Sequence, residues 1–109
     1  MMMFGKMLKS GDVVLTKIQF TDTFEIKKRS ALVLFEDFDN VVVAGITSNL
    51  NMKSISITKK DGAIKDSVIK LNYIFTVSKM MVEKVLFSLS KNKKKEVFDQ
   101  LVVKLRDLK

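Results

Sequence analysis

The chain has 109 residues, 47% of them hydrophobic, which is enough for one domain with a real core and too little for two. It contains no cysteine and no histidine, which excludes disulfides, thiolate metal sites and nucleophiles that depend on a histidine base. The net charge of +8 favours nucleic acid, an acidic protein or an anionic surface as partner, although a lysine-rich solvated surface would give the same value.

The N-terminal segment, MMMFGKML, is apolar but too short to span a bilayer, and it lacks the features of a secretory signal. We expect one domain over residues 1–109, in which residues 1–10 are a flexible extension or the product of an upstream start codon. No other segment reaches the length of a membrane helix, and the absence of cysteine fits a reducing cytosol. These features predict a cytoplasmic protein with no membrane partner.

Two strands separated by a loop are predicted next. Residues 12–20 (DVVLTKIQF) alternate with a period of two, which is typical of a strand and not of a helix. The polar segment Thr21–Lys28 is predicted as a loop. Residues 29–35 (RSALVLF) form a second strand, whose continuous apolar run indicates burial on both faces.

A hairpin turn at residues 36–40 (EDFDN) leads into a third strand at residues 41–48 (VVVAGITS). Gly45 interrupts this strand and indicates a bulge or a close approach of backbone. The paired carboxylates of the chain lie in the turn, where solvated hairpin chemistry explains them better than a site for a hard cation. The sequence therefore predicts no metal site.

The segments that follow are short and closely spaced. We expect a loop at 49–53, a turn at 59–63 with an Asp-Gly signal, one helical turn at 78–82, and strands at 54–58, 66–71, 73–77 and 83–89. After Ser90, a plausible N-cap, the pattern changes to helical spacing, with an apolar stripe at Val97, Leu101, Leu105 and Leu108 that Phe98 and Val102 widen. Parallel strands need long crossovers that this chain lacks, so the fold class is mainly β: a small antiparallel barrel with a C-terminal α-helix.

A polar pair at the ends of two predicted strands is the strongest candidate site. Arg29 begins the second strand, and Thr47 and Ser48 end the third, so a hairpin between these strands brings Arg29 and Thr47 to one rim of the sheet. A guanidinium and a hydroxyl that converge on one point can hold a phosphate. The alternative is that Arg29 pairs with Glu25 or Asp22 and that Thr47 is an ordinary strand-end hydroxyl.

The order GDVVL, KKRSALVL, ITSN and KDSVIKLNYIFTV, followed by a basic helix, resembles the PemK/MazF-like toxins of bacterial and archaeal toxin–antitoxin pairs. The resemblance covers nearly the whole chain from Gly11 to Leu108. It implies an SH3-like barrel, shared with the CcdB and Kid toxins, and a homodimer. It also implies a metal-independent endoribonuclease, without cofactor, that cuts single-stranded mRNA.

The resemblance also implies roles for individual residues. Arg29 would stabilise charge on the phosphate while the RNA 2′-hydroxyl attacks it, and Thr47 would hold a non-bridging oxygen. The loop Thr21–Lys28 would cover the site and help to choose the RNA sequence. The remaining substrate-binding candidates are Phe20, Thr21, Lys28, Ser48, Asn49 and Tyr73, by contact with bases or with the flanking backbone.

Two segments depart from the family pattern. Ser30 stands where the family usually has proline, and LNYIFT (residues 71–76) replaces a segment that is charged in better-known members. Phe75 then suggests a more apolar contact near the dimer interface. These departures leave a second function open, in which a basic barrel binds a gyrase-type protein target, DNA or RNA without cutting it. Either function implies a cognate acidic antitoxin as partner.

Overall fold

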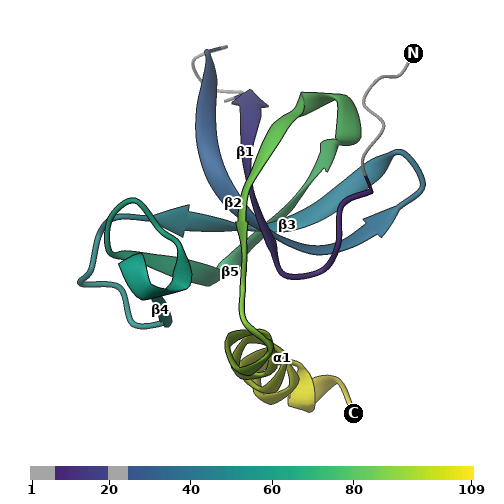
Figure 1. Ribbon diagram of the computed structural model, residues 1–109. Coiled ribbons are helices and arrows are strands. Elements are labelled where there is room, and N and C mark those ends of the chain that lie inside the picture. The colour runs from purple at the N-terminus through teal and green to yellow at the C-terminus, as the bar shows by residue number, and fades with distance from the viewer. Residues whose placement is uncertain (1–6, 20–24) are drawn as a thin grey trace.

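The computed structural model describes residues 7–19 and 25–109. Within these residues, six strands form one curled antiparallel sheet that is followed by a C-terminal helix (Figure 1). The strands are β1 (Asp12–Gln19), β2 (Ile26–Asp37), β3 (Asn40–Thr47), β4 (Ile55–Ile57), β5 (Ser67–Ser78) and β6 (Val82–Ser88). The helix is α1 (Lys91–Leu105), and three 3₁₀ turns are η1 (Lys59–Asp61), η2 (Lys79–Met81) and η3 (Arg106–Leu108).

The strand order in the sheet is β4-β5-β3-β2-β1-β6, so β4 and β6 form its two edges. The sheet curls without joining these edges, which makes it a half-barrel and not a closed barrel. The prediction of a mainly β, antiparallel fold with a C-terminal helix is confirmed. The hairpin turn is also confirmed, because Phe38 and Asp39 alone connect β2 to β3.

Each face of the curled sheet carries its own buried apolar cluster. Val13 and Leu32 belong to one cluster, whereas their neighbours Val14 and Val33 belong to the other. This division follows from the alternation of side chains along a strand. The predicted burial of both faces of the second strand is confirmed, since Ala31, Leu32 and Val33 are all within 1% of complete burial.

The β2–β3 hairpin opens before its strands end. The ladder between the two strands finishes at the pair Ala31 and Gly45. Beyond it, β2 stays paired with β1 as far as Ile26, and β3 stays paired with β5 as far as Thr47. Figure 1 shows the two strands diverging there, β2 toward the top and β3 toward the left. We call the space between residues 26–30 and 46–47 the fork.

A bulge in β5 lies beside the fork. The partner of Ala44 on β5 is Ile74, but the partner of Gly45 is Lys70, so residues 71–73 lie between two consecutive pairs. The bulged Tyr73 crosses over Gly45, where an added Cβ would lie 2.7 Å from the ring atom Cδ2. The predicted close approach at Gly45 is therefore confirmed, and the side chain that approaches it is aromatic.

Two predicted boundaries were wrong. Ile26, Lys27 and Lys28 belong to β2 and not to a loop, because they continue the ladder with β1. Residues 66–71 and 73–77 are not two strands, since β5 runs from Ser67 to Ser78 without a break. The polar Asn72 that suggested a gap lies in the bulge.

Helix α1 packs on the open end of the half-barrel. Ser90 is its N-cap, and its Oγ accepts a hydrogen bond from Lys93 N at 3.2 Å. Val97 and Leu101 pack against the core, but the rest of the predicted apolar stripe (Phe98, Val102, Leu105 and Leu108) is exposed. No helix in the described part of the chain combines the length and the hydrophobicity that spanning a bilayer requires.

Candidate functional site

A pocket of about 270 Å³ lies at the fork. Arg29 from β2 and Thr47 from β3 line it from opposite sides, and Tyr73 from the β5 bulge also lines it. The other lining residues are Ile18, Ser30, Gly45, Ile46, Lys70 and Phe75. The two donors that the sequence singled out are therefore brought together, but across a pocket and not as neighbours on a continuous ladder.

Arg29 occupies the β2 arm of the fork, where its side chain is exposed to solvent. Its Nη1 donates a hydrogen bond to the carbonyl oxygen of Lys28 at 3.1 Å. A guanidinium keeps its charge throughout the physiological pH range and presents several N–H donors in one plane. At this position it can bind an anion that enters the pocket from solvent.

Thr47 ends β3 and is half-buried. Its Oγ1 accepts a hydrogen bond from the backbone N of Asn49 at 3.1 Å. That bond uses a lone pair and fixes the oxygen, so the hydroxyl proton remains available to donate. The arrangement suits an incoming oxygen acceptor, such as a phosphate oxygen.

An aromatic pair forms one wall of the pocket. The rings of Tyr73 and Phe75 are 5.0 Å apart between centroids, tilted by 40°. Lys70 Nζ lies 4.6 Å from the centre of the Tyr73 ring, within reach of a cation–π interaction. The pocket thus combines two cations, the hydroxyls of Thr47 and Ser30, and an aromatic surface.

Lys70 is a site residue that the sequence did not reveal. It lies on β5 inside a segment of ordinary strand pattern, and only the β5 bulge places it beside Tyr73. A bulge of this kind leaves no clear sequence signal, apart from the polar Asn72 within an apolar run.

Three further predicted binding residues that the structure describes, Lys28, Ser48 and Asn49, do not line the pocket. Lys28 faces away, with its Nζ 3.2 Å from Glu83 Oε1 on β6. Ser48 and Asn49 are exposed after β3, and Asn49 Oδ1 accepts a hydrogen bond from Asn51 N at 3.1 Å within the following turn. Phe20 and residues 21–24, which are the first half of the predicted covering loop, lie outside the described residues.

The domain that contains the pocket has known relatives. The profile of the PemK-like, MazF-like toxins of type II toxin–antitoxin systems matches residues 9–105. The chain belongs to this family. No curated protein sequence matches the chain. The matched region contains β1 to α1 and so includes the whole Arg29–Thr47 pocket.

Solved structures of similar fold agree with this assignment. The Mycobacterium tuberculosis toxin MazF-mt6 superposes with a TM-score of 0.70 at 15% sequence identity, covering 84% of this chain and 93% of that chain. A mycobacterial endoribonuclease in complex with its cognate antitoxin superposes with a TM-score of 0.68 at 13% identity, covering 88% of this chain and 90% of that chain. At these identities the structures support the family fold of the chain.

Proposed function

We propose that this family member is the toxin of a type II toxin–antitoxin pair and cleaves single-stranded mRNA without a metal ion. The observation that carries the proposal is the pair of donors, Arg29 and Thr47, on opposite arms of one solvent-accessible pocket. The proposal is supported by the family and by the aromatic wall, because single-stranded RNA is bound by phosphate contacts together with base stacking.

The chemistry that fits these groups is an internal transesterification. The RNA 2′-oxygen forms a bond to the adjacent phosphorus and loses its proton to water, while the bond from phosphorus to the 5′-oxygen breaks. The products are a cyclic phosphate and a 5′-hydroxyl, whose oxygen takes up a proton. Arg29 offsets the charge that develops on the phosphate, Thr47 donates to a non-bridging oxygen, and water returns the proton to the 5′-oxygen. Each such donor typically changes kcat by about 10²- to 10³-fold.

The nucleotides around the cleaved bond would extend beyond the pocket. Tyr73 and Phe75 offer a stacking surface inside it. Ser48 and Asn49 follow the β3 arm, and we assign them to the flanking nucleotides on that side. In the sequence, Phe20 and Thr21 follow β1, and Lys28 lies on β2, so we assign these three residues to the flanking nucleotides on the other side.

We further propose a cytoplasmic homodimer that is held inactive by an acidic antitoxin. The apolar residues left exposed on α1 give the protein a surface that a second copy could cover, and sedimentation velocity would report the dimer. The net charge of +8 complements an acidic partner. One solved structure of this fold is an endoribonuclease in complex with its cognate antitoxin.

The test of the proposed function is end-mapping of a mixed RNA pool incubated with the protein in excess chelator. We expect cleavage at a short sequence, with cyclic-phosphate and 5′-hydroxyl ends. Arg29→Ala and Thr47→Val should lower kcat by about 10²-fold or more, since each removes one donor to the phosphate. Arg106→Ala removes an arginine in η3, away from the pocket, and serves as the matched control.

Intact RNA after prolonged incubation would contradict the proposal. The second candidate function, binding without cleavage, is favoured by the departures of the sequence from better-known members. It would be supported by salt-sensitive RNA or DNA binding with no new ends, or by capture of a gyrase-type protein that Arg29→Ala does not affect.

A further inference from the structure

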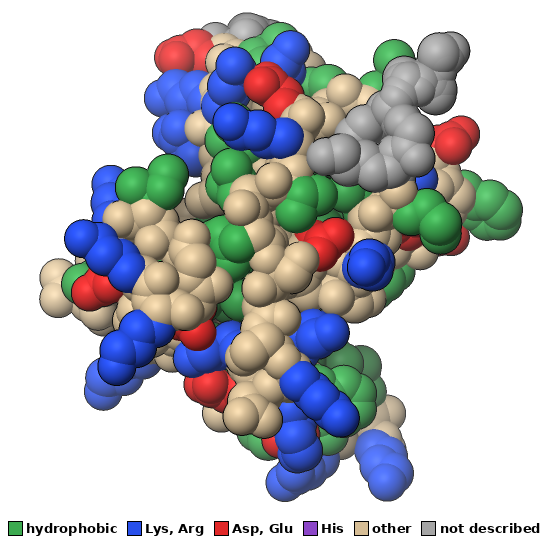
Figure 2. All heavy atoms as spheres, in the orientation of Figure 1, with side chains coloured by type: hydrophobic (Ala, Val, Ile, Leu, Met, Phe, Trp, Pro, Cys, Tyr) green, Lys and Arg blue, Asp and Glu red, His purple; other side chains and the backbone are tan. Residues whose placement is uncertain are grey.

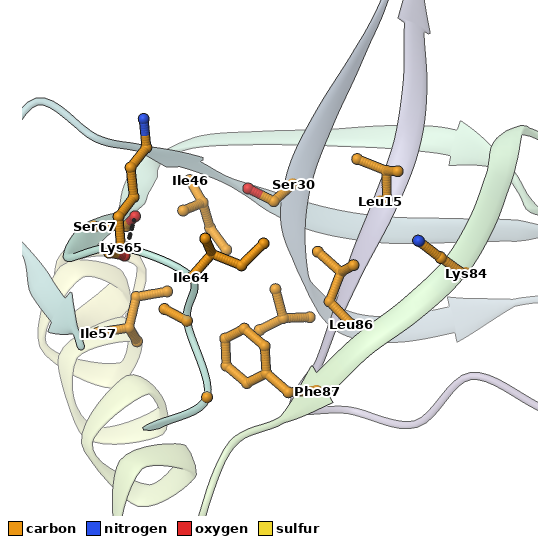
Figure 3. A pocket seen from close by; sticks show the side chains of 13 residues that line it. Leu15, Ser30, Ile46, Ile57, Ile64, Lys65, Ser67, Lys84, Leu86 and Phe87 are labelled. Atoms are coloured by element: carbon orange, nitrogen blue, oxygen red, sulfur yellow. Dashed lines mark hydrogen bonds between the residues drawn. The ribbon is translucent and has the colours of Figure 1, made fainter. Parts of the chain in front are cut away.

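A second pocket, of about 440 Å³, lies on the face of the sheet whose apolar cluster contains Val13 and Ile57. Ile57 of β4 and Leu86 of β6 both line it, so it lies between the two edges that the sheet leaves unjoined. We call it the seam cleft. Figure 3 shows Ile46, Ile57 and Ile64 on one side facing Leu15, Leu86 and Phe87 on the other.

The seam cleft is continuous with the fork. Ser30 and Ile46, which diverge from each other across the fork, line both the seam cleft and the Arg29–Thr47 pocket. A flexible ligand held at Arg29 and Thr47 therefore needs to extend only past these two residues to enter the cleft. Its volume falls within the range of about 300–1,000 Å³ that is usual for small-molecule sites.

The seam cleft has few polar groups, and most of them can still form a hydrogen bond or an ion pair with a ligand. The Ser30 side chain points toward Ile46 in Figure 3, and its hydroxyl has no hydrogen-bond partner among the described residues. Lys65 and Lys84 stand on opposite sides of the cleft, and neither forms an ion pair within residues 7–19 and 25–109. The lining is otherwise apolar apart from Ser67, whose Oγ donates a hydrogen bond to Lys65 O at 3.0 Å.

We propose that the seam cleft binds the base of a nucleotide flanking the cleaved phosphate, and that it sets part of the RNA sequence preference. This inference rests on the proposed function. A nucleobase has apolar faces and a hydrogen-bonding edge, which match two apolar walls and one hydroxyl. The lysines on either side match the phosphates before and after that base. An aliphatic side chain of another protein would fill the space between the apolar walls, but it would offer the Ser30 hydroxyl no hydrogen bond.

The experiment combines a modified RNA with a modified protein. Once the cleaved bond is mapped, oligonucleotides of that sequence are made with a single abasic ribose at each flanking position. We expect one position at which removal of the base lowers kcat/KM of the unmodified protein by roughly 10-fold, because loss of a stacked base costs about 1–3 kcal/mol. Leu86→Ala should lower kcat/KM on intact RNA and lose most of this dependence on the base.

Two further variants serve as a second test of the cleft and as a control. Ile64→Ala changes the opposite wall at a residue that is 87% exposed, so it tests the cleft again with little effect on folding. Met80→Ala removes an equally exposed side chain in η2, outside the cleft and away from α1, and should keep full sensitivity to the abasic position. Circular dichroism melting confirms that each variant is folded.

Three outcomes would overturn the inference. If every abasic substrate affects Leu86→Ala, Ile64→Ala and the unmodified protein by the same factor, the cleft does not hold a base, although the proposed function stands. If both variants cleave RNA normally but lose affinity for an acidic peptide partner, the occupant is protein. If the unmodified protein cleaves no RNA, the proposed function fails and this inference fails with it.

Discussion

At the scale of single residues, the contact between Gly45 and Tyr73 determines the shape of the pocket. Gly45 has no side chain, and this lets the Tyr73 ring cross the strand and stack on Phe75 beside Lys70. A Cβ at Gly45 would lie 2.7 Å from the ring, closer than side-chain atoms normally approach. The absence of a side chain at Gly45 therefore determines the position of the Tyr73 ring in the pocket wall.

Gly45→Ala should displace Tyr73, lower RNA cleavage and reduce the free energy of unfolding by about 1–3 kcal/mol, as overpacking does. Chemical denaturation and kcat/KM measure the two effects. In a Tyr73→Ala background the same substitution should cost much less, because the ring that it meets is absent. An equal cost in both backgrounds would contradict this account.

At the scale of secondary-structure elements, helix α1 is held to the sheet by few apolar contacts, which two lysines supplement. Val97 is its one buried residue, and Lys93 Nζ donates a hydrogen bond to Ser56 O in β4 at 2.9 Å. The Lys94 side chain lies over Gly11, at the start of β1. Lysines early in a helix oppose its dipole, but these two contact the sheet and help to attach the helix to it.

Ser90→Ala should lower the free energy of unfolding by about 1 kcal/mol, since it removes the N-cap bond to Lys93 N. Ser54→Ala, in the loop before β4, serves as the control and should change stability little. Thermal melting by circular dichroism measures both. Equal melting temperatures for the two variants would show that the cap contributes nothing.

The sequence predicted most elements because periodicity and turn residues carry local information. The strand pattern at residues 12–20, the hairpin turn and the Ser90 cap each depend on neighbouring residues alone. The fork, the β5 bulge and the position of Lys70 depend on how distant strands pair, so no local pattern encoded them. Thr47 was found because the end of β3 could be located from the sequence. Arg29 was singled out as the predicted start of a strand that in fact begins at Ile26, so the boundary used to find it was wrong although the residue does line the pocket.

At the scale of the whole molecule, the surface charge should govern association with RNA. Figure 2 shows Lys and Arg side chains over both arms of the sheet and along α1. With about four phosphate contacts, affinity for a single-stranded RNA blocked by a 2′-O-methyl group should fall roughly 50-fold between about 50 and 200 mM salt. Fluorescence anisotropy measures this dependence.

Arg29→Ala should reduce the slope of log affinity against log salt by about 0.7, the value for one lost phosphate contact in a single strand. Arg106→Ala should leave the slope unchanged, because Arg106 lies in η3 outside the pocket. If the two substitutions alter the slope equally, Arg29 does not bind a phosphate directly.

The fork has a mechanical consequence for this half-barrel. Beyond the pair Ala31 and Gly45, and among the residues that the structure describes, no strand pairing joins the arm made of β1, β2 and β6 to the arm made of β3, β4 and β5. A molecule that binds Arg29 and Thr47 at the same time links the two arms. Occupancy would then stiffen the whole scaffold, so that substrate and inhibitor alike would protect the chain from unfolding.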